Sequence, residues 1–279
     1  MNATPRLRAR HLLQALWALV ARELLKSSRQ HGRLVSALVR PVLWLAVFAA
    51  GFRSVFGVAI VEPYDSYVPY DVYIAPGLVG MVLLFNGMQS SLAMVYDREM
   101  GVMRMLLAAP LPRPWLLFAK LTATAVLSLV QALVFVIVAA LLGTELPFVV
   151  SRLPQVLAAT TATALMLGAL GLLLSVHIRQ LENFAGTMNF VIFPMYFLST
   201  ALYPLWKLEE SGARWVYELA RVNPFTHAVE WMRFALYDKD PGIAPWIVLG
   251  TAALCFAVAC AGYDPQRGFG ALSRRGSTA

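Results

Sequence analysis

Few residues in this chain have the types and spacing that covalent or proton-transfer chemistry requires. None of the four histidines begins the His-Glu-x-x-His pattern that holds zinc on one face of a helix. No serine follows a glycine by two places, so the Gly-x-Ser-x-Gly elbow of serine hydrolases is absent. No lysine directly follows a glycine, as it does in a phosphate-binding loop. The sequence therefore offers no motif with which this chain could hydrolyse a peptide, an ester or a nucleotide.

Charged residues are also missing where an ion-driven pump would need them. Such a pump places Asp, Glu, Lys or His at depth within its spans, because coupling requires a titratable or ion-binding group there. The long apolar runs of this chain carry only neutral polar residues near their middles, and such residues more often join helices than bind cargo, although a cavity uses similar groups. They are Gln89, Ser90, Ser91, Gln131, Thr160, Thr161, Thr163, Asn189 and Ser199. If the chain moves a substrate, the energy must come from a separate polypeptide.

Charged residues are frequent in one segment between two apolar runs, the stretch YDREMGVMRMLLAAPLPRPWLLFAKL. Apolar residues recur there at helical spacing, which predicts a short helix over 97–109 that three prolines bring to an end. A glycine inside a helix costs about 1 kcal/mol relative to alanine, so Gly101 predicts a close backbone approach. Gly168 and Gly171, in a later run, likewise predict close contact between helices. The side chains placed for water or for a partner are Arg98, Glu99 and Arg104.

The composition places this corner in a membrane protein. The chain has 279 residues, of which 59% are hydrophobic and 14% charged, and its mean hydropathy is +0.65. A soluble domain has roughly 45–50% apolar and 25% charged residues. Runs of about 20 apolar residues cross the hydrocarbon layer as helices, whereas barrel strands alternate in polarity. We therefore predict an all-α polytopic membrane protein, with one transmembrane domain over 1–279 and six transmembrane helices. The six spans are 38–58, 73–96, 116–143, 155–176, 184–203 and 243–263.

The basic residues are divided unevenly between the loops. In the predicted topology, the side that holds both termini has 16 basic and 5 acidic residues, and the other side has 7 and 10. An excess of Lys and Arg marks the cytoplasmic side. We therefore predict a multi-pass protein of the plasma membrane, or of the bacterial inner membrane, with both termini in the cytoplasm. The net charge of +8 reflects this orientation and does not require a nucleic-acid partner.

Residues 1–35 carry an amphipathic pattern. Leu12, Leu16, Val20 and Leu24 recur every four residues, which predicts a cytoplasmic helix that lies in the headgroup layer of the lipid membrane. Two other interpretations remain open: a solvated basic arm, and a cleaved signal peptide, although no small-residue cleavage site precedes the charges that follow. The residues expected to hold the helix at the interface are Trp17, Arg22, Lys26, Arg29 and Arg33.

A long loop over 204–242 separates the fifth and sixth spans. Its sequence predicts two short amphipathic helices on the outer side, over 205–222 and 223–237. Asn223 suits the N-cap of the second helix, and Pro224 suits its first turn. The two helices would either cover the outer mouth of the bundle or form a folded loop with no gating role.

The charged corner resembles the segment after the second span of type-2 ATP-binding-cassette (ABC) exporter permeases. In that family an acidic–Arg–Glu–x–Gly run precedes a Leu-rich stretch, a proline and, further on, a lysine. The matching positions here are Asp97, Arg98, Glu99, Gly101, Leu106, Leu107, Pro110 and Lys120. The resemblance extends to the basic N-terminal helix, the six spans and the outer helices, so it covers nearly the whole chain. Arg104 departs from it, because many members have an acidic or neutral residue there.

The resemblance implies a division of labour between subunits. Two permease copies, identical or related, would form the pathway, and a separate ABC ATPase (nucleotide-binding) subunit would bind ATP and magnesium. This chain would then be no enzyme by itself and would hold no cofactor or metal. Its coupling segment, 97–113, would enter a groove of the ATPase. The residues expected there are Asp97, Arg98, Glu99, Gly101, Arg104, Met105 and Leu106. Two other functions remain open: a non-transporting membrane scaffold, and an integral membrane enzyme with unrecognised residues.

Overall fold

The all-α prediction is confirmed, apart from one antiparallel pair of two-residue strands, in the part of the chain that the computed structural model describes. The described residues are 9–29, 31–52, 57–58, 68–101, 111–144, 150–178, 180–210 and 212–263. The elements, in chain order, are α1 (Ala9–Ser28), α2 (His31–Phe52), β1 (Gly57–Val58), β2 (Val68–Pro69), α3 (Tyr70–Glu99), α5 (Arg113–Leu141), η1 (Val150–Arg152), α6 (Leu153–His177), α7 (Leu181–Phe197), α8 (Leu205–Glu210), α9 (Arg214–Val222), α10 (Pro224–Tyr237) and α11 (Ala244–Gly262).

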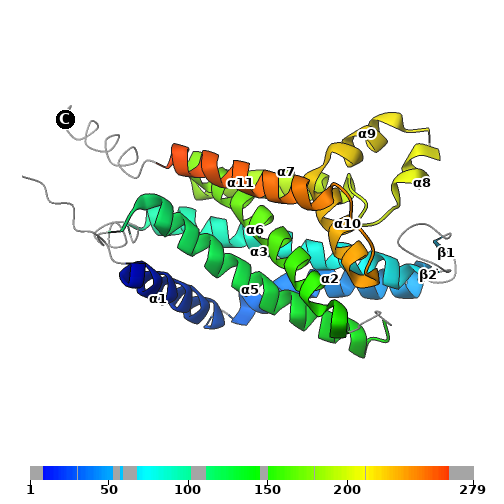
Figure 1. Cartoon of the computed structure of the whole chain (residues 1–279), viewed down its shortest axis with the longest axis horizontal. Coiled ribbons are helices and arrows are strands. Elements are labelled where there is room, and N and C mark those ends of the chain that lie inside the picture. The colour runs from blue at the N-terminus through cyan, green and yellow to red at the C-terminus, as the bar shows by residue number, and fades with distance from the viewer. Residues whose placement is uncertain are drawn as a thin grey trace, which may run out of the picture.

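The long helices lie side by side and give the molecule two distinct ends (Figure 1). At one end α3 stops and α5 begins, and α1, the turn between α6 and α7 and the end of α11 lie there too. We call it the α3–α5 end. The strands, with α8 and α9, lie at the opposite end, the β1–β2 end. The helix α3 is largely buried and packs against α2, α5, α6 and α7, so its C-terminus lies close to several other helices.

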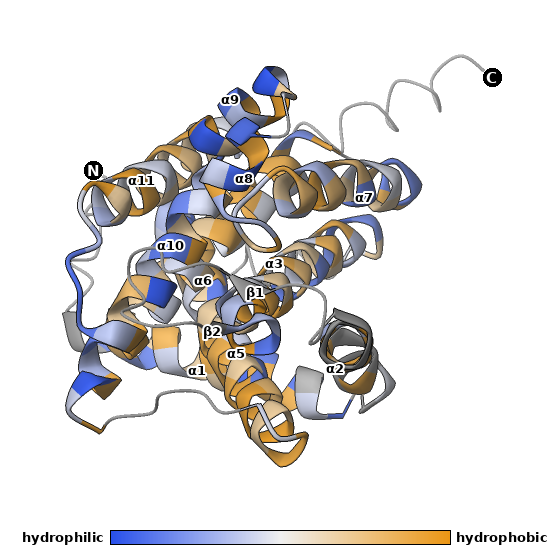
Figure 2. Ribbon diagram, turned by 90° about the vertical axis from the view of Figure 1, so that its right-hand side faces the viewer, coloured by the Kyte–Doolittle hydropathy of each residue, from blue (hydrophilic) through white to orange (hydrophobic). Residues whose placement is uncertain are grey.

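Four helices of the described chain are long and apolar enough to cross a membrane: α3, α5, α6 together with η1, and α11. They overlap four of the six predicted spans. The predicted span 38–58 overlaps α2, which contains the shorter apolar stretch Leu38–Val47, and 184–203 overlaps α7, which has 17 residues. The count of six therefore stays a prediction. Figure 2 shows α5 and α11 as largely hydrophobic, whereas hydrophilic residues are frequent on α8 and α9.

The N-terminal segment differs from the predicted single helix. The helix α1 ends at Ser28 and α2 begins at His31, so Arg33 belongs to α2 and not to the helix that it was expected to anchor. Val20 is buried where α1 packs on the bundle, whereas the side chain of Trp17 is 73% exposed. The helix α1 therefore has one face for the bundle and exposed apolar side chains on another.

The loop before α11 also departs from its predicted form. The first predicted helix is divided into α8 and α9, and the second is α10. Asn223 caps α10 as predicted, since its Oδ1 accepts a hydrogen bond from a backbone N–H of the first turn at 2.9 Å. However, α10 enters the core: its Arg233 is 2% exposed, pairs with Glu230 at 2.6 Å and donates to Thr200 O at 3.0 Å. These partners allow a charged residue to be buried, so α10 is part of the bundle and does not lie over it.

Two glycines of α6 allow its neighbours to approach closely. A Cβ on Gly171 would lie 2.9 Å from Gly87 O on α3, and closer still to the hydroxyl of Ser91. A Cβ on Gly168 would lie 2.8 Å from Leu121 Cδ1 on α5. The prediction of close helix contact at both glycines is therefore confirmed.

Gly171→Ala should lower the stability of the bundle by about 1–3 kcal/mol, because the new methyl group forces α3 and α6 apart. Gly250→Ala on α11 is the matched control, since no heavy atom of the described residues lies within 4 Å of a Cβ built there. That control should be neutral or slightly stabilising, because alanine is favoured over glycine in a helix by about 1 kcal/mol. The measurement is the thermal unfolding midpoint of each purified variant in detergent, and equal midpoints would contradict the packing argument.

Candidate functional site

Asp97 lies at the C-terminal end of α3, which continues to Glu99. The predicted separate helix is therefore wrong over its first three residues, which extend α3 instead. The carboxylate of Asp97 is 3% exposed and has two cationic neighbours. Lys26 Nζ on α1 lies 3.0 Å from its Oδ1, and Lys120 Nζ on α5 lies 3.5 Å from its Oδ2. Lys120 Nζ also lies 3.7 Å from Glu23 Oε1 on α1, so acids and bases alternate across three helices.

Arg98 and Glu99 attach α3 to the turn between α6 and α7. Arg98 Nη2 donates to Ser175 O at 2.6 Å and to Ile178 O at 2.7 Å, two carbonyls at the C-terminal end of α6. Glu99 Oε1 accepts a hydrogen bond of 2.8 Å from the backbone N–H of Leu181, the first residue of α7. A cation at a helix C-terminus and an anion at a helix N-terminus both complement the helix dipole. These two residues therefore stabilise the end of α6 and the start of α7.

Three consecutive residues thus connect α3 to four other helices, and we call Asp97, Arg98 and Glu99 the α3 junction. Successive side chains of an α-helix point about 100° apart, because the helix has 3.6 residues per turn. Neighbours in sequence therefore reach in different directions: Asp97 to α1 and α5, Arg98 to α6, and Glu99 to α7. Their position at the last turn of α3 places all of these contacts at the α3–α5 end.

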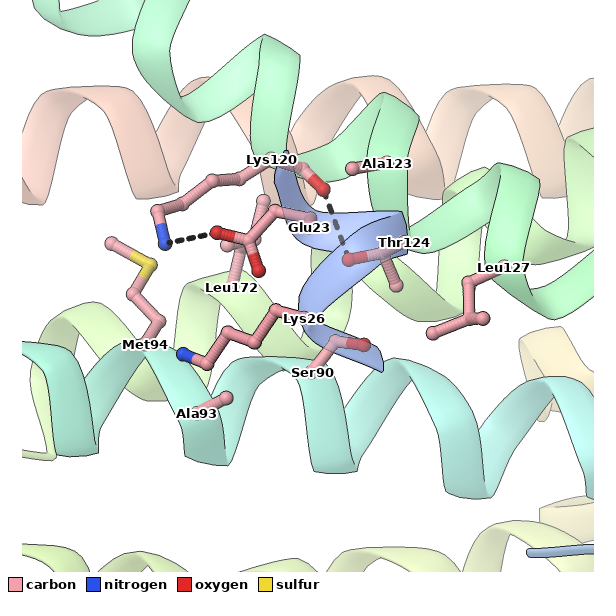
Figure 3. Close-up of a pocket in the computed structure, with 10 residues that line it drawn as sticks. All are labelled: Glu23, Lys26, Ser90, Ala93, Met94, Lys120, Ala123, Thr124, Leu127 and Leu172. Atoms are coloured by element: carbon pink, nitrogen blue, oxygen red, sulfur yellow. Dashed lines mark hydrogen bonds and ion pairs between the residues drawn. The ribbon is translucent and has the colours of Figure 1, made fainter. Parts of the chain in front are cut away.

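A small polar cavity of about 40 Å³ lies between α1, α3 and α5, beside the α3 junction. Figure 3 shows Glu23 and Lys26 reaching toward it from α1, and Lys120 from α5, with the ion pair between Lys120 and Glu23 marked. A volume of roughly 10–15 Å³ is enough to hold one water molecule among polar partners. The charged groups therefore meet in a space that can hold a few water molecules, which lowers the cost of keeping them ionised.

Gly101 ends α3 and does not lie inside a helix. Its φ is +74°, and its N–H donates to Arg98 O at 3.2 Å. Glycine adopts this left-handed conformation without steric cost, and it is the common residue just beyond a helix C-terminus. Among the described residues, no heavy atom lies within 4 Å of a Cβ built at this position, so they show no sign of the predicted close backbone approach. Arg104, Met105 and Leu106 lie outside the described residues.

The residues expected to hold α1 at the membrane interface have several different environments. Lys26, expected on the polar face, is directed to the bundle and pairs with Asp97. Arg22 Nη1 lies 3.7 Å from an acidic neighbour on the same helix. Arg29 and Trp17 are exposed. The interfacial role of these residues stays a prediction, and Lys26 has a structural role besides.

The sequence analysis did not place Glu23 or Lys120 among the site residues. Lys120 carried a usable signal, because it is the only charged residue in the predicted span 116–143. An ionisable residue at membrane depth indicates a buried partner or a functional site. Trp115 makes a second contact between α5 and α1, because its Nε1 donates to Leu12 O at 3.1 Å.

The α3 junction has the properties of a mechanical connection. Its charged groups contact one another or backbone groups at helix ends, and within the described ranges no cluster of three His, Cys, Asp or Glu side chains could hold a metal ion. The arrangement can transmit force between helices, and it offers no nucleophile paired with a base.

Known proteins resemble this chain over most of its length. The family model described as ABC-2 type transporter matches residues 14–237. The transport permease ycf38 of Porphyra purpurea is 29% identical over 243 residues, which cover 85% of this chain and 79% of that protein. The protein of that name from Cyanophora paradoxa is 30% identical over 238 residues, covering 82% and 76%. The matched regions are long enough to include the α3 junction and the helices that it connects.

Proposed function

The chain belongs to the ABC-2 type transporter family and is a transmembrane permease, and from this premise we propose that it is the membrane subunit of an ABC exporter. Two copies of the chain, or this chain with a related subunit, would form the translocation pathway. A separate cytoplasmic ATPase would bind ATP and magnesium and supply the energy. The chain would then have no catalytic activity by itself.

The α3 junction is the observation that most directly supports coupling to an ATPase. It lies within the predicted coupling segment 97–113, immediately before the turn that leads into residues 102–110. A displacement of that segment would act on the last turn of α3 and, through the junction, on α1, α5, α6 and α7. Leaving one charge of a buried ion pair without its partner costs about 3–5 kcal/mol, so the ion pairs of Asp97 make α1, α3 and α5 resist separate movement. The junction would therefore convert a local displacement into movement of whole helices.

We place the α3–α5 end in the cytoplasm. The uneven distribution of Lys and Arg supports this orientation, and the basic residues Lys26, Arg98, Arg113 and Lys120 lie at or near that end. In the six-span arrangement, α2 and α7 would cross the membrane beside the four long apolar helices. Both termini would be cytoplasmic, in the plasma membrane or a bacterial inner membrane, and the β1–β2 end would face outward.

Assembly with an ATPase tests the proposed function. Co-expression with an ABC ATPase subunit from the same genome should yield a complex of two membrane and two ATPase subunits, measured by native mass spectrometry. The permease alone should hydrolyse no ATP, because it has no phosphate-binding loop, and its presence should change the rate of the ATPase. A membrane scaffold would leave that rate unchanged, and hydrolysis by the permease alone would overturn the division of labour.

Reporter fusions test the topology. The charge distribution predicts cytoplasmic signals at residues 30 and 101 and at the C-terminus. It predicts external signals at residues 65, 148 and 212. Two reporters, one active only in the cytoplasm and one active only outside it, should give opposite results at every site. A cytoplasmic signal at 212 would contradict the six-span arrangement.

A further inference from the structure

A cavity of about 470 Å³ lies between α2, α3 and α7, away from the α3 junction. In Figure 2, α2 and α7 lie on either side of α3. Cavities that bind small molecules usually have volumes of roughly 300–1,000 Å³, with an apolar wall and a few polar groups. This cavity has that composition. The residues of its wall that carry the argument are Arg40, Trp44, Phe85, Asn189, Phe193 and Tyr196.

The guanidinium of Arg40 lies beside the middle of α3, although the side chain is exposed in the single chain. Its Cζ is 4.7 Å from the centre of the Phe85 ring, and Phe85 is the sixteenth of the 30 residues of α3. At 1.5 Å per residue, that ring is roughly 21 Å from either end of α3. None of the described residues that line the cavity is acidic. A cation at such depth in a membrane protein is costly and marks a functional site by default, with a partner to be identified.

A second polar group, the side-chain amide of Asn189, belongs to the same wall. An amide can donate a hydrogen bond to an acidic group as well as accept one. The ring of Tyr196 also lines the cavity, but its hydroxyl oxygen has almost no accessible surface and does not face the open space. The polar groups of the wall are therefore few, and Arg40 and Asn189 can both donate to an anion.

Aromatic rings form most of the rest of the wall, together with Met81 and Ile192. The Phe193 ring stacks on Phe197 with centres 6.1 Å apart, and Trp44 and Tyr196 meet Phe197 edge-on at 6.1 Å and 5.5 Å. Such a surface favours an apolar chain or ring over a polar one. A neutral sugar would leave most of its hydroxyl groups unpaired here, and a cation would be repelled by Arg40.

We propose that this cavity binds an anionic amphiphile: an acidic head, such as a phosphate, carboxylate or sulfonate, joined to an apolar chain or ring. The head pairs with Arg40, and the apolar part lies on the aromatic wall. The inference rests on the proposed function, because such a ligand is either the exported cargo or an anionic lipid held by the permease.

Photo-crosslinking of the permease in phosphatidylcholine nanodiscs tests the proposal. The probe is a hexadecyl sulfonate that carries a diazirine in its chain. The uncharged control probe is the corresponding hexadecyl alcohol with the same diazirine. The sulfonate should label peptides of α2, α3 and α7, and Arg40→Gln should reduce that labelling roughly tenfold, as expected for loss of a charge-assisted bond. Arg40→Lys should retain most of it, and the alcohol should label Arg40→Gln as it labels the wild type, which shows that the variant is folded. Arg221→Gln, an exposed arginine on α9, is the control for loss of charge elsewhere.

The two sources of the ligand are separated by competition. Displacement of the probe by phosphatidylglycerol added to the nanodiscs would identify a lipid, and displacement by octanesulfonate in the buffer would identify a soluble cargo. Equal labelling by sulfonate and alcohol, or unchanged sulfonate labelling in Arg40→Gln, would overturn the proposal. The labelling needs no ATPase, so failure of ATPase assembly would count against the proposed function without affecting this result.

Discussion

Asparagine in place of Asp97 should lower the free energy of unfolding of the permease by about 3 kcal/mol or more. The substitution keeps the size of the side chain and removes the negative charge between Lys26 and Lys120. Lys120 is 8% exposed and would keep Glu23, at 3.7 Å, as its acidic neighbour among the described residues. A buried charge that loses its partner costs far more than an exposed ion pair, which is worth about 0–1 kcal/mol. The thermal midpoint of the purified protein in nanodiscs should fall by roughly 6 °C or more.

A double substitution isolates the charge effect. Lys120→Met alone should be milder, because Asp97 keeps Lys26 at 3.0 Å. Combined with Asp97→Asn, it should restore more than half of the lost stability, because it removes the buried charge that has lost one of its two acidic neighbours and supplies an apolar side chain of similar length. Glu182→Gln, which changes an exposed carboxylate on α7, is the matched control and should have no effect. A double variant as unstable as the sum of the two single ones would show that Asp97 and Lys120 are not coupled.

The long apolar helices could be predicted from the sequence because hydropathy measures the same property that membrane burial requires. The end of α3 could not. Asp97, Arg98 and Glu99 have the composition of a solvated turn, and the predicted span stopped before them for that reason. They continue the helix because each has a partner on another helix, and contacts between helices far apart in sequence cannot be read from one chain.

The same limit explains α10. Its sequence is amphipathic, so a surface helix was the natural prediction. Glu230 and Arg233 pair with each other, and Arg233 also donates to Thr200 O. The charged groups of α10 therefore have partners inside the bundle. For Lys120 the sequence did carry a signal, because a single charge in an apolar span indicates a buried partner. The partners, Glu23 on α1 and Asp97 on α3, could be identified only from the packing of these helices beside α5.

Glu99→Lys should uncouple the permease from its ATPase while leaving membrane insertion normal. Two roles of the carboxylate predict this result: direct docking to the ATPase, and the hydrogen bond that it accepts from Leu181 N at the start of α7. Lysine removes both and places a positive charge at a helix N-terminus, where the dipole disfavours it. A docked charge left without its partner is worth about 2–5 kcal/mol, which corresponds to at least a roughly thirtyfold weaker Kd. The measurements are the Kd for the ATPase and the change in hydrolysis rate on binding.

Glu99→Gln separates the two roles, because glutamine keeps an acceptor oxygen for Leu181 N and carries no charge. If the charge docks the ATPase, Glu99→Gln should fail nearly as badly as Glu99→Lys. If the capping of α7 is what matters, it should behave like the wild type. Glu218→Lys makes the same charge reversal on α9, an exposed position at the β1–β2 end, and should leave binding and hydrolysis unchanged. Normal association and normal coupled hydrolysis in Glu99→Lys would show that this residue only borders a solvated turn, and α1 would then be the next surface to test for contact with the ATPase.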